Sequence, residues 1–480
     1  MPEQSLKEKY YRDLSALFVS AFSKQPSQIM DLRSDGSNRK LLRLKSGDFS
    51  AVGVYGPDRL ENNAFVGFSR HFRSLGLPVP EIYAYDETSK VYLETDLGDS
   101  TLFDTLISMR KEESFPPGAI ELYKKSLLQL SRFQTEGGKN LNYRLCYPRD
   151  AFDRQSITWD LNYFKYYFVK LGGIAFNEQK LEDDYSALTD LLVSARNDFF
   201  LYRDFQSRNI MVMNGEVFFI DYQGGRRGAL QYDVASLLFD AKADLTPEAR
   251  AELLDYYLSL PEIKSVTDRE EFMKFYYAFI YIRIMQAMGA YGLRGFYEKK
   301  THFLQSVPYV IKNLEWLLSN AQMPVKLPEL NRVFKKIVAS TYLRNFGSKK
   351  LGLTLKVLSF SYKNGIPQDF SGHNGGFVFD CRCLPNPGRE ERYKSLTGRD
   401  KEVAVYLQSS PEVEKFFQNA FSLASLAIDN YLSRNFTDLS VCFGCTGGQH
   451  RSVYMAEKLA AAFRGRKGIK VELKHTQIRK

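Results

Sequence analysis

The chain has 480 residues, of which 44% are hydrophobic, and it carries a formal net charge of +10. This length suggests two to four domains with sizeable cores. No uninterrupted apolar run approaches the roughly 20 residues that cross a bilayer, and five cysteines in a chain this long exclude a disulfide framework.

The N-terminal segment predicts an amphipathic helix and not a signal peptide. Its first residues have mixed charge and no apolar core. The apolar residues that recur at helical spacing are Leu6, Tyr10, Leu14, Leu17 and Phe18. We therefore expect a cytoplasmic protein with no membrane partner.

Residues 30–97 are expected to form a small β-rich lobe. The predicted elements are strands over Arg39–Lys45 and Phe49–Tyr55, a helix over Asn62–Leu75, and strands near Ile82 and Val91. A turn with a single glycine, Ser34-Asp-Gly-Ser-Asn-Arg39, precedes them. Two interpretations of it stay open: a turn that covers nucleotide phosphates, with Ser37 and Asn38 as ligands, and an ordinary hairpin tip.

Beyond Asp99 the chain is predicted to be mostly helical, because apolar residues recur every three to four positions. The predicted helices include Ala119–Thr135, Trp159–Leu171, Asp183–Arg196 and a buried helix over Phe275–Met288. Trp159, Asp160 and Asn162 are candidates for a substrate pocket. An amphipathic core helix is the other interpretation of the same residues.

Residues 201–223 hold the most informative pattern in the chain. The run from Ile210 to Ile220 is apolar on both sides of Asn214-Gly215, which predicts a tight hairpin because both central residues must take φ > 0. The hairpin returns the chain, so we expect Asp221 to lie near Asn209.

Three side chains of this segment suit phosphoryl transfer. The reaction needs a base that accepts the proton of the acceptor hydroxyl, and oxygen ligands that hold Mg²⁺ on the phosphates. We predict Asp204 as the base, with Asn209 and Asp221 as the metal ligands. Aspartates that merely cap a turn or start a loop are the other interpretation.

The segment resembles the aminoglycoside phosphotransferase branch of the protein-kinase-like fold, whose catalytic loop reads His-x-Asp-x4-Asn before a hairpin and a metal-binding Asp. The match extends over Leu75–Ile82, Glu94–Gly98 and Gly228–Leu238, within roughly residues 10–320. The chain looks most like the bacterial N-acetylmuramate/N-acetylglucosamine anomeric kinases, which phosphorylate the C1 hydroxyl of the sugar in cell-wall recycling. The resemblance implies a bilobal α+β fold that binds ATP and Mg²⁺.

Two positions depart from this family. Tyr202 stands where the family usually has a His that supports the loop. No lysine marks the third strand, where Ser50–Gly56 occupies the region whose lysine normally meets the nucleotide phosphates. Arg43 or Lys45 on the preceding strand are candidates to replace it, and Glu94 is a further candidate cofactor-binding residue. A degenerate, non-catalytic kinase is the alternative.

Two prolines in Gln322–Pro328 predict a linker after the kinase-like unit. We expect a kinase-like domain over 1–321 (N-lobe about 30–97, C-lobe about 98–321), a linker and connecting helix over 322–350, and a second domain over 351–480. The last part is the more basic, with 19 Lys and Arg against 12 Asp and Glu. Its basic end, Arg464–Lys480, either attracts RNA phosphates or is a solvated strand and tail.

Residues 439–459 predict a strand, a glycine loop and a helix. Such a turn presents backbone N–H groups and the positive end of a helix to an anion. The candidate anion-binding residues are Thr446, Gly447, Gly448, His450 and Arg451. Glycines used only for the geometry of a tight turn are the other interpretation.

Four cysteines lie in the last hundred residues, as C-x-C (381, 383) and C-x2-C (442, 445). They suggest either a zinc site or small core residues, and the alternation around Cys381 and Cys383 predicts a strand with both thiols on one face. Cys445-x5-Arg451-Ser452 also has the spacing of cysteine-dependent phosphatases. A nucleotide P-loop is excluded, because the Gly-x4-Gly-Lys-[Ser/Thr] pattern is absent.

This region resembles the C-terminal domain of the RNase adapter protein RapZ. The matching pieces are 359–367, 379–387, 397–400 and 444–452. The resemblance implies an α/β domain that binds a phosphorylated amino sugar and, in some bacteria, small RNAs, with a pocket formed by Thr446, Gly447, His450 and Arg451 and by the further candidates Lys363, Arg382 and Asn386. Gly388 stands where the family usually has a pocket His, and the family's N-terminal P-loop domain is missing.

We therefore expect an ATP- and Mg²⁺-dependent kinase of an amino-sugar hydroxyl, with a C-terminal domain that senses a phosphorylated sugar or binds RNA. The alternative is a non-catalytic adaptor that binds RNA or protein.

Overall fold

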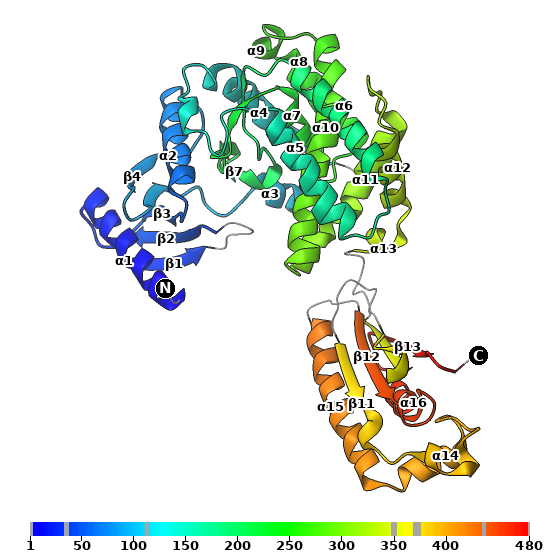
Figure 1. Cartoon of the computed structure of the whole chain (residues 1–480). Coiled ribbons are helices and arrows are strands. Elements are labelled where there is room, and N and C mark those ends of the chain that lie inside the picture. Colours follow the sequence, from blue (N-terminus) through cyan, green and yellow to red (C-terminus); the bar gives the residue numbers. More distant parts are fainter. Residues whose placement is uncertain are drawn as a thin grey trace. The chain divides into compact units, whose positions relative to one another are not determined.

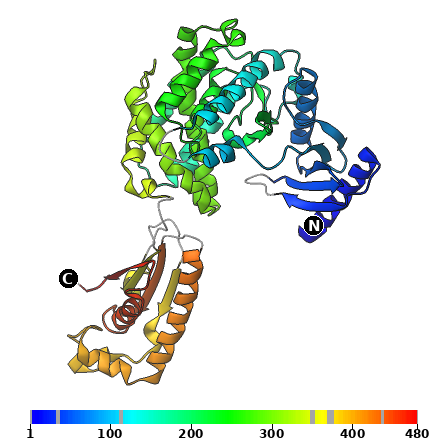
Figure 2. The ribbon, with the colours of Figure 1, turned by 180° about the vertical axis from the view of Figure 1, so that it is seen from behind.

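The chain, described by a computed structural model over residues 3–32, 38–110, 115–346, 353–367, 376–433 and 438–478, has two compact units (Figures 1 and 2). Unit 1 is Met1–Leu293 with Tyr309–Ser340, and unit 2 is Arg294–Pro308 with Thr341–Lys480. None of the helices in the described ranges has the length and apolar character that a membrane span requires. The finer boundaries expected from the sequence stay a prediction.

The first part of unit 1 is an antiparallel five-stranded sheet in the order β1-β2-β3-β5-β4 (Figure 1). Its elements are α1 (Glu3–Phe22), β1 (Gln28–Leu32), β2 (Lys40–Ser46), β3 (Phe49–Tyr55), α2 (Arg59–Ser74), β4 (Ile82–Asp86) and β5 (Val91–Thr95). The strands and helices predicted here are confirmed.

Alternation along the strands gives the sheet two different faces. Leu42 and Leu44 of β2 are fully buried in a cluster with Leu14 and Phe18 of α1. The residues between them point the other way: Arg43 of β2 stands opposite Val52 of β3, which stands opposite Glu94 of β5. Charged side chains therefore collect on the face away from α1.

The rest of unit 1 is mainly helical, as predicted. Its elements are α3 (Leu102–Met109), α4 (Pro117–Arg132), α5 (Arg154–Tyr163), α6 (Glu178–Ser194), β6 (Phe199–Leu201), β7 (Ile210–Met213), β8 (Glu216–Phe219), β9 (Arg226–Gly228), α7 (Gln231–Leu238), α8 (Pro247–Ser259), α9 (Pro261–Lys264), α10 (Arg269–Tyr291), α11 (Val307–Asn320) and α12 (Pro328–Ala339). The buried helix α10 packs against α5 and α7. Its charged Arg283 is accommodated because its Nε donates to Ser236 Oγ at 2.8 Å.

Helix α12 packs on α6 within unit 1. The Glu329 carboxylate accepts a hydrogen bond from Asn177 N at 2.6 Å, and Asp184 accepts one from Leu330 N at 2.7 Å. The helix expected to connect the two domains is thus held by the kinase-like unit.

Unit 2 is built on a parallel sheet in the order β11-β12-β10-β13. Its elements are α13 (Thr341–Arg344), β10 (Leu353–Ser361), β11 (Gly376–Asp380), α14 (Lys401–Gln408), α15 (Pro411–Ser433), β12 (Asp438–Cys445), α16 (Arg451–Phe463) and β13 (Ile469–His475). Leu353, Leu355 and Val357 of β10 join one core with α15 and α16. This is the α/β architecture expected for the second domain.

One local prediction is wrong. β11 ends at Asp380, and residues 381–383 form a 3-10 turn, so Cys381 is buried whereas Cys383 is exposed. The two thiols therefore do not share a strand face. The cause is a side-chain cap, because the Asp380 carboxylate accepts a hydrogen bond from Arg382 N at 2.9 Å and turns the chain.

Candidate functional site

The predicted hairpin is present and brings Asp221 to Asn209. Asn214 and Gly215 take φ values of 53° and 77° between β7 and β8. Ile220 N donates to Asn209 O at 3.1 Å, which closes the base of the hairpin. Asn209 Nδ2 then lies 3.3 Å from Asp221 Oδ2.

The loop that carries Asp204 is held in place by a buried carboxylate. Asp233 of α7 accepts hydrogen bonds from Tyr202 N at 2.7 Å and from Arg203 N at 3.0 Å. Arg203 has a φ of 83°, which costs energy in a residue with a side chain. Its guanidinium donates to both carboxylate oxygens of Asp160, at 2.6 and 2.8 Å. These contacts over-determine the strained turn from which Asp204 emerges.

Tyr202 supports the loop, which is the role of the His that the family usually has at this position. Its ring is fully buried, and its hydroxyl donates to Ile220 O at 2.6 Å. The bond reaches the residue directly before Asp221. The tyrosine at the family's usual His position therefore ties the loop that carries Asp204 to the segment that carries Asp221.

The surroundings of Asp204 suit a general base. Burial raises the pKa of the Asp204 carboxyl, and the neighbouring Asp221 carboxylate raises it further, against the lowering effect of Arg203. A carboxylate with a raised pKa is a stronger proton acceptor. Asn209 Nδ2 donates to the backbone carbonyl of Asp204 at 2.8 Å, so the base and the candidate ligand form one cluster.

Asn209 and Asp221 fit Mg²⁺ with phosphates as the remaining ligands. Both offer oxygen donors, and Mg²⁺ is usually held by one or two protein oxygens plus phosphates and water. Gln223 Nε2 donates to Asp221 Oδ1 at 2.7 Å and orients that carboxylate. Within the described part of the chain, no group of three or more His, Cys, Asp or Glu side chains could hold a metal by itself.

The four candidate cofactor residues of the N-lobe have different environments. Ser37 lies outside the described residues, and Asn38 is exposed in a bend before β2. Arg43 is engaged by two carboxylates: it donates to Asp96 at 2.7 and 2.9 Å and to Asp99 at 2.9 and 3.0 Å.

Glu94 is the fourth candidate and is buried beside a cation. Its side chain is 8% exposed, and Oε2 has no hydrogen-bond partner in the structure. Burial raises the pKa of Glu94 to about 8, against the lowering effect of Arg39. At neutral pH this residue is mainly an uncharged acid.

Sequence reasoning missed Arg39. Its guanidinium lies 3.6 Å from Glu61 Oε2 of α2 and 3.7 Å from Asp221 Oδ1. The sequence did contain a signal, because Arg39 is the last residue of the predicted phosphate-covering turn and is separated from Arg43 by an even number of positions, which places both on one face of a strand.

The predicted substrate residues are not equivalent. Asp160 is buried and is used by Arg203, so it shapes the base loop. Trp159 is 46% exposed, with Arg149 5.9 Å from its ring centroid. Asn162 is half-buried.

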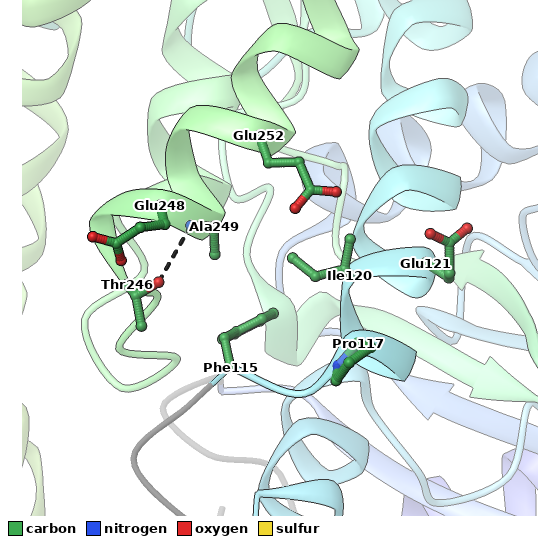
Figure 3. A pocket seen from close by; sticks show the side chains of 8 residues that line it. All are labelled: Phe115, Pro117, Ile120, Glu121, Thr246, Glu248, Ala249 and Glu252. Atoms are coloured by element: carbon green, nitrogen blue, oxygen red, sulfur yellow. Dashed lines mark hydrogen bonds between the residues drawn. The ribbon is translucent and has the colours of Figure 1, made fainter.

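A cavity of 360 Å³ lies elsewhere in unit 1 (Figure 3). It opens between the N-terminal turns of α4 and α8, and its lining includes Phe115, Ile120, Glu121, Glu248 and Glu252. No residue of the Asp204 cluster lines it. Lys124 bridges Glu121 and Glu252, at 3.2 and 2.9 Å. This ammonium group therefore balances part of the negative charge that lines the cavity.

In unit 2 the candidate anion site lies where three parallel strands end. Ser361 of β10 is in register with Cys445 of β12, and Asp380 of β11 with Gly444. The predicted residues that follow these ends directly are Lys363, Arg382, Thr446 and Gly447. The carboxyl edge of a parallel sheet is the usual ligand position in such folds. Lys363, Thr446 and Gly447 are exposed there.

The other candidates face inward or are paired. His450 Nε2 lies 2.8 Å from Tyr393 O, and Arg451 Nη1 donates to the carbonyls of Arg382 and Leu384, at 3.0 Å each. Arg382 itself donates to both oxygens of Asp380. Arg451 therefore ties the loop after β11 to the start of α16 in this structure.

Gly388 leaves room beside His450. A Cβ placed on Gly388 would lie 3.4 Å from His450 Cε1 and 3.5 Å from Asn386 Oδ1. Asn386 and His450 are thus neighbours at the position where the family usually adds another His. Gly448, with a φ of 68°, is closely packed, because its Cβ would approach Ser361 N to 2.9 Å.

The cysteine of the phosphatase-like spacing is buried. Cys445 Sγ accepts a hydrogen bond from Gly448 N at 3.2 Å and lies 3.1 Å from Ser452 Oγ. Burial raises the pKa of the Cys445 thiol, but the donors from Ser452 and Gly448 outweigh it and the pKa is lowered overall. Arg451, which a phosphatase would aim at the phosphate, is committed to backbone carbonyls.

Comparison with known proteins agrees with both units. Residues 31–273 match the phosphotransferase enzyme family, and residues 353–479 match the RapZ C-terminal domain. The chain belongs to the phosphotransferase enzyme family and carries a RapZ-type C-terminal domain.

Its relatives share the C-terminal part. A nucleotide-binding protein of Thioalkalivibrio sulfidiphilus is 43% identical over 126 residues, which are 26% of this chain and 42% of that protein. The RNase adapter protein RapZ of Klebsiella pneumoniae is 37% identical over 167 residues, 35% of this chain and 56% of that protein. The chain thus spans about half the length of these relatives. Among solved structures, choline kinase LicA of Streptococcus pneumoniae is 12% identical with a TM-score of 0.41, covering 63% of this chain and 99% of that one.

Proposed function

We propose that this chain is an ATP- and Mg²⁺-dependent kinase that phosphorylates a hydroxyl of an amino sugar of the N-acetylmuramate or N-acetylglucosamine type. The observation that carries the proposal is the convergence of Asp204, Asn209 and Asp221 around one hairpin, with bonds of 2.8 and 3.3 Å linking them. Membership of the phosphotransferase enzyme family supports it.

Each residue has a defined role in this proposal. Asp204 accepts the proton of the acceptor hydroxyl while that oxygen bonds to the terminal phosphorus and the bond to the departing ADP oxygen breaks. Asn209 and Asp221 hold Mg²⁺, which when bound neutralises charge on the phosphates. Asp233 and Tyr202 position the loop and do not touch the reactants.

The positive charge of Arg226, near Asp204, supports an acceptor sugar that carries a carboxylate. Arg226 is 6% exposed, and its Nε donates to Gly224 O at 3.0 Å. No carboxylate of the described residues pairs with it, and burial, followed by repulsion from Arg203, lowers its pKa. A buried cation is costly unless anions lie near it, and a carboxylate on the ligand would add one. N-acetylmuramate, which carries a carboxylate, is therefore expected to be used better than N-acetylglucosamine.

The test is phosphoryl transfer from labelled ATP to N-acetylmuramate, N-acetylglucosamine and aminoglycosides. Asp204→Asn should reduce kcat by about 10²- to 10⁴-fold, the usual contribution of a general base, and should not lower the thermal transition, because burial already disfavours the charged carboxylate. Asp198→Asn, a surface aspartate paired with Arg196 at 2.8 Å, is the matched control and should keep full turnover. Wild-type turnover retained in Asp204→Asn would defeat the base assignment.

A second proposal concerns unit 2, for which the RapZ C-terminal match is the specific observation. We propose that its sheet edge binds a phosphorylated amino sugar, or that its basic surface binds RNA in an adaptor role. Exposed Lys363, Thr446 and Gly447 support the sugar-phosphate site. Titration of the full chain with glucosamine 6-phosphate against glucosamine, in wild type and Lys363→Met, tests it.

A further inference from the structure

Strand β3 offers no cation to a nucleotide. On the face away from α1, Val52 stands opposite Arg43 and Glu94, and Val54 stands opposite Leu41. In the protein-kinase fold a cation of this strand pairs with an acid of the following helix and meets the phosphates near the metal-binding Asp. A working site therefore needs a cation from somewhere else.

Arg39 reaches this place from the neighbouring strand. It directly precedes β2 and lies on the same face as Arg43 by alternation. It is 9% exposed, and its Cζ lies 5.9 Å from the ring centroid of Phe65 on α2. Glu61, in the first turn of α2, and Asp221, the candidate metal ligand, lie 3.6 and 3.7 Å from its two terminal nitrogens.

The other two candidates are less suitable. Arg43 already donates to both oxygens of Asp96 and both oxygens of Asp99. Lys45 lies six residues further along β2 than Arg39, which is roughly 20 Å in an extended strand. Only Arg39 contacts both an acid of α2 and the metal-ligand aspartate among the described basic residues.

We propose that Arg39 replaces the missing strand lysine as the cation that binds the nucleotide phosphates, with Glu61 as its positioning partner. This inference rests on the proposed kinase function. The side chains of its two carboxylate partners, Glu61 and Asp221, are 45% and 40% exposed. A guanidinium also suits phosphate, because its donors match two oxygens at once.

The buried acid next to Arg39 does not compete with the phosphates. Burial raises the pKa of Glu94 to about 8, so at neutral pH it is mainly uncharged. The cation therefore keeps its attraction for an incoming anion.

Nucleotide binding to the full chain tests the inference. Calorimetric titration with the non-hydrolysable analogue AMP-PNP and Mg²⁺ is compared with titration with adenosine, which has no phosphate. Arg39→Met should weaken AMP-PNP binding about 10- to 100-fold, the range expected for lost charge-assisted bonds, and change adenosine binding less than about twofold. Arg39→Lys should recover part of the loss, because a point charge still attracts phosphate.

The matched control is Arg73→Met. Arg73 also pairs with a glutamate of the same lobe, Glu81 at 2.9 Å, but it is exposed. Its AMP-PNP affinity should equal that of the wild type. Thermal melting of each variant reports whether the fold is kept.

Several outcomes overturn the inference. Unchanged AMP-PNP affinity in Arg39→Met does so, as does an equal loss for AMP-PNP and adenosine, which shows a structural role. A selective loss in Arg43→Met, with Arg39→Met unaffected, assigns the phosphates to Arg43. If the wild-type protein turns over substrate and the AMP-PNP affinity of Arg39→Met is unaffected, only this inference fails. If the wild-type protein binds neither AMP-PNP nor adenosine, the kinase proposal fails as well.

Discussion

At the scale of single residues, burial decides which charges are available for chemistry. Asp160 and Arg203 form an ion pair with each other, and Arg43 forms ion pairs with Asp96 and Asp99. Glu94 is different, because Oε2 of its buried carboxyl has no hydrogen-bond donor among the described residues and the group has a raised pKa. Such a group lowers stability whenever the unfolded chain would carry it ionised.

Glu94→Gln should therefore stabilise the protein in a pH-dependent way. Below about pH 4.5 both the folded and the unfolded carboxyl are protonated, so wild type and variant should melt alike. As pH rises toward 8, the folded pKa of about 8 keeps Glu94 protonated while the unfolded carboxyl ionises, and the wild type loses stability. The gain of the variant should reach on the order of 4 kcal/mol near pH 8, or several degrees in Tm.

Differential scanning calorimetry from pH 4 to 8 measures this gain. Glu8→Gln, an exposed position on α1, is the control and should show no such trend. A Tm difference for Glu94→Gln that stays constant with pH would contradict the prediction.

At the scale of elements, one tight turn determines the geometry of the candidate site. The hairpin of β7 and β8 places Asp221 against Asn209, and its two central residues have positive φ. Gly215 has open space where a Cβ would stand, so a substitution there meets backbone strain and no steric clash.

Gly215→Ala should lower the free energy of unfolding by about 1 kcal/mol, because an L-residue at a φ of 77° is strained. Turnover should fall along with stability, since Asp221 is positioned through the strand that follows the turn. Asn214→Gly is the comparison variant and should be nearly neutral, because glycine tolerates the φ of 53° at that position. Melting curves and turnover of both variants measure the effect, and equal behaviour of the two would argue against strain as the cause.

At the scale of the whole molecule, the two units have different charge and different candidate ligands. Residues 351–480 carry 19 basic against 12 acidic residues. The basic end is not a loose tail, because β13 pairs with β10 and His475 Nδ1 lies 2.7 Å from Ser359 Oγ. Removing Arg464–Lys480 would take an integral strand out of the sheet, so charge must be changed by substitution.

If unit 2 binds RNA, replacing Arg464, Lys467 and Lys474 with Gln should flatten the dependence of log affinity on log salt. Each lost phosphate contact should reduce the slope by about one. Filter binding of a labelled structured RNA over a range of salt concentrations measures it. Neutralising Lys180, Lys264 and Lys274, which are exposed in unit 1, should leave the slope unchanged. No RNA binding at low salt would remove the adaptor proposal.

The sequence by itself determined the features that depend on near neighbours. The Asn214-Gly215 turn and the strand–glycine loop–helix after residue 438 follow from local backbone preferences, and the structure has both. The ranges of the N-lobe strands likewise follow from local sequence patterns.

Only the tertiary structure decided which partner each charged side chain has. Arg43 faces Asp96 and Asp99, Arg451 faces backbone carbonyls, and Arg39 stands between α2 and Asp221, although all three are arginines near a predicted phosphate loop. A guanidinium has five donors and binds whichever acceptors the fold brings within reach. Those acceptors come from distant elements, so no local pattern in the sequence specifies them.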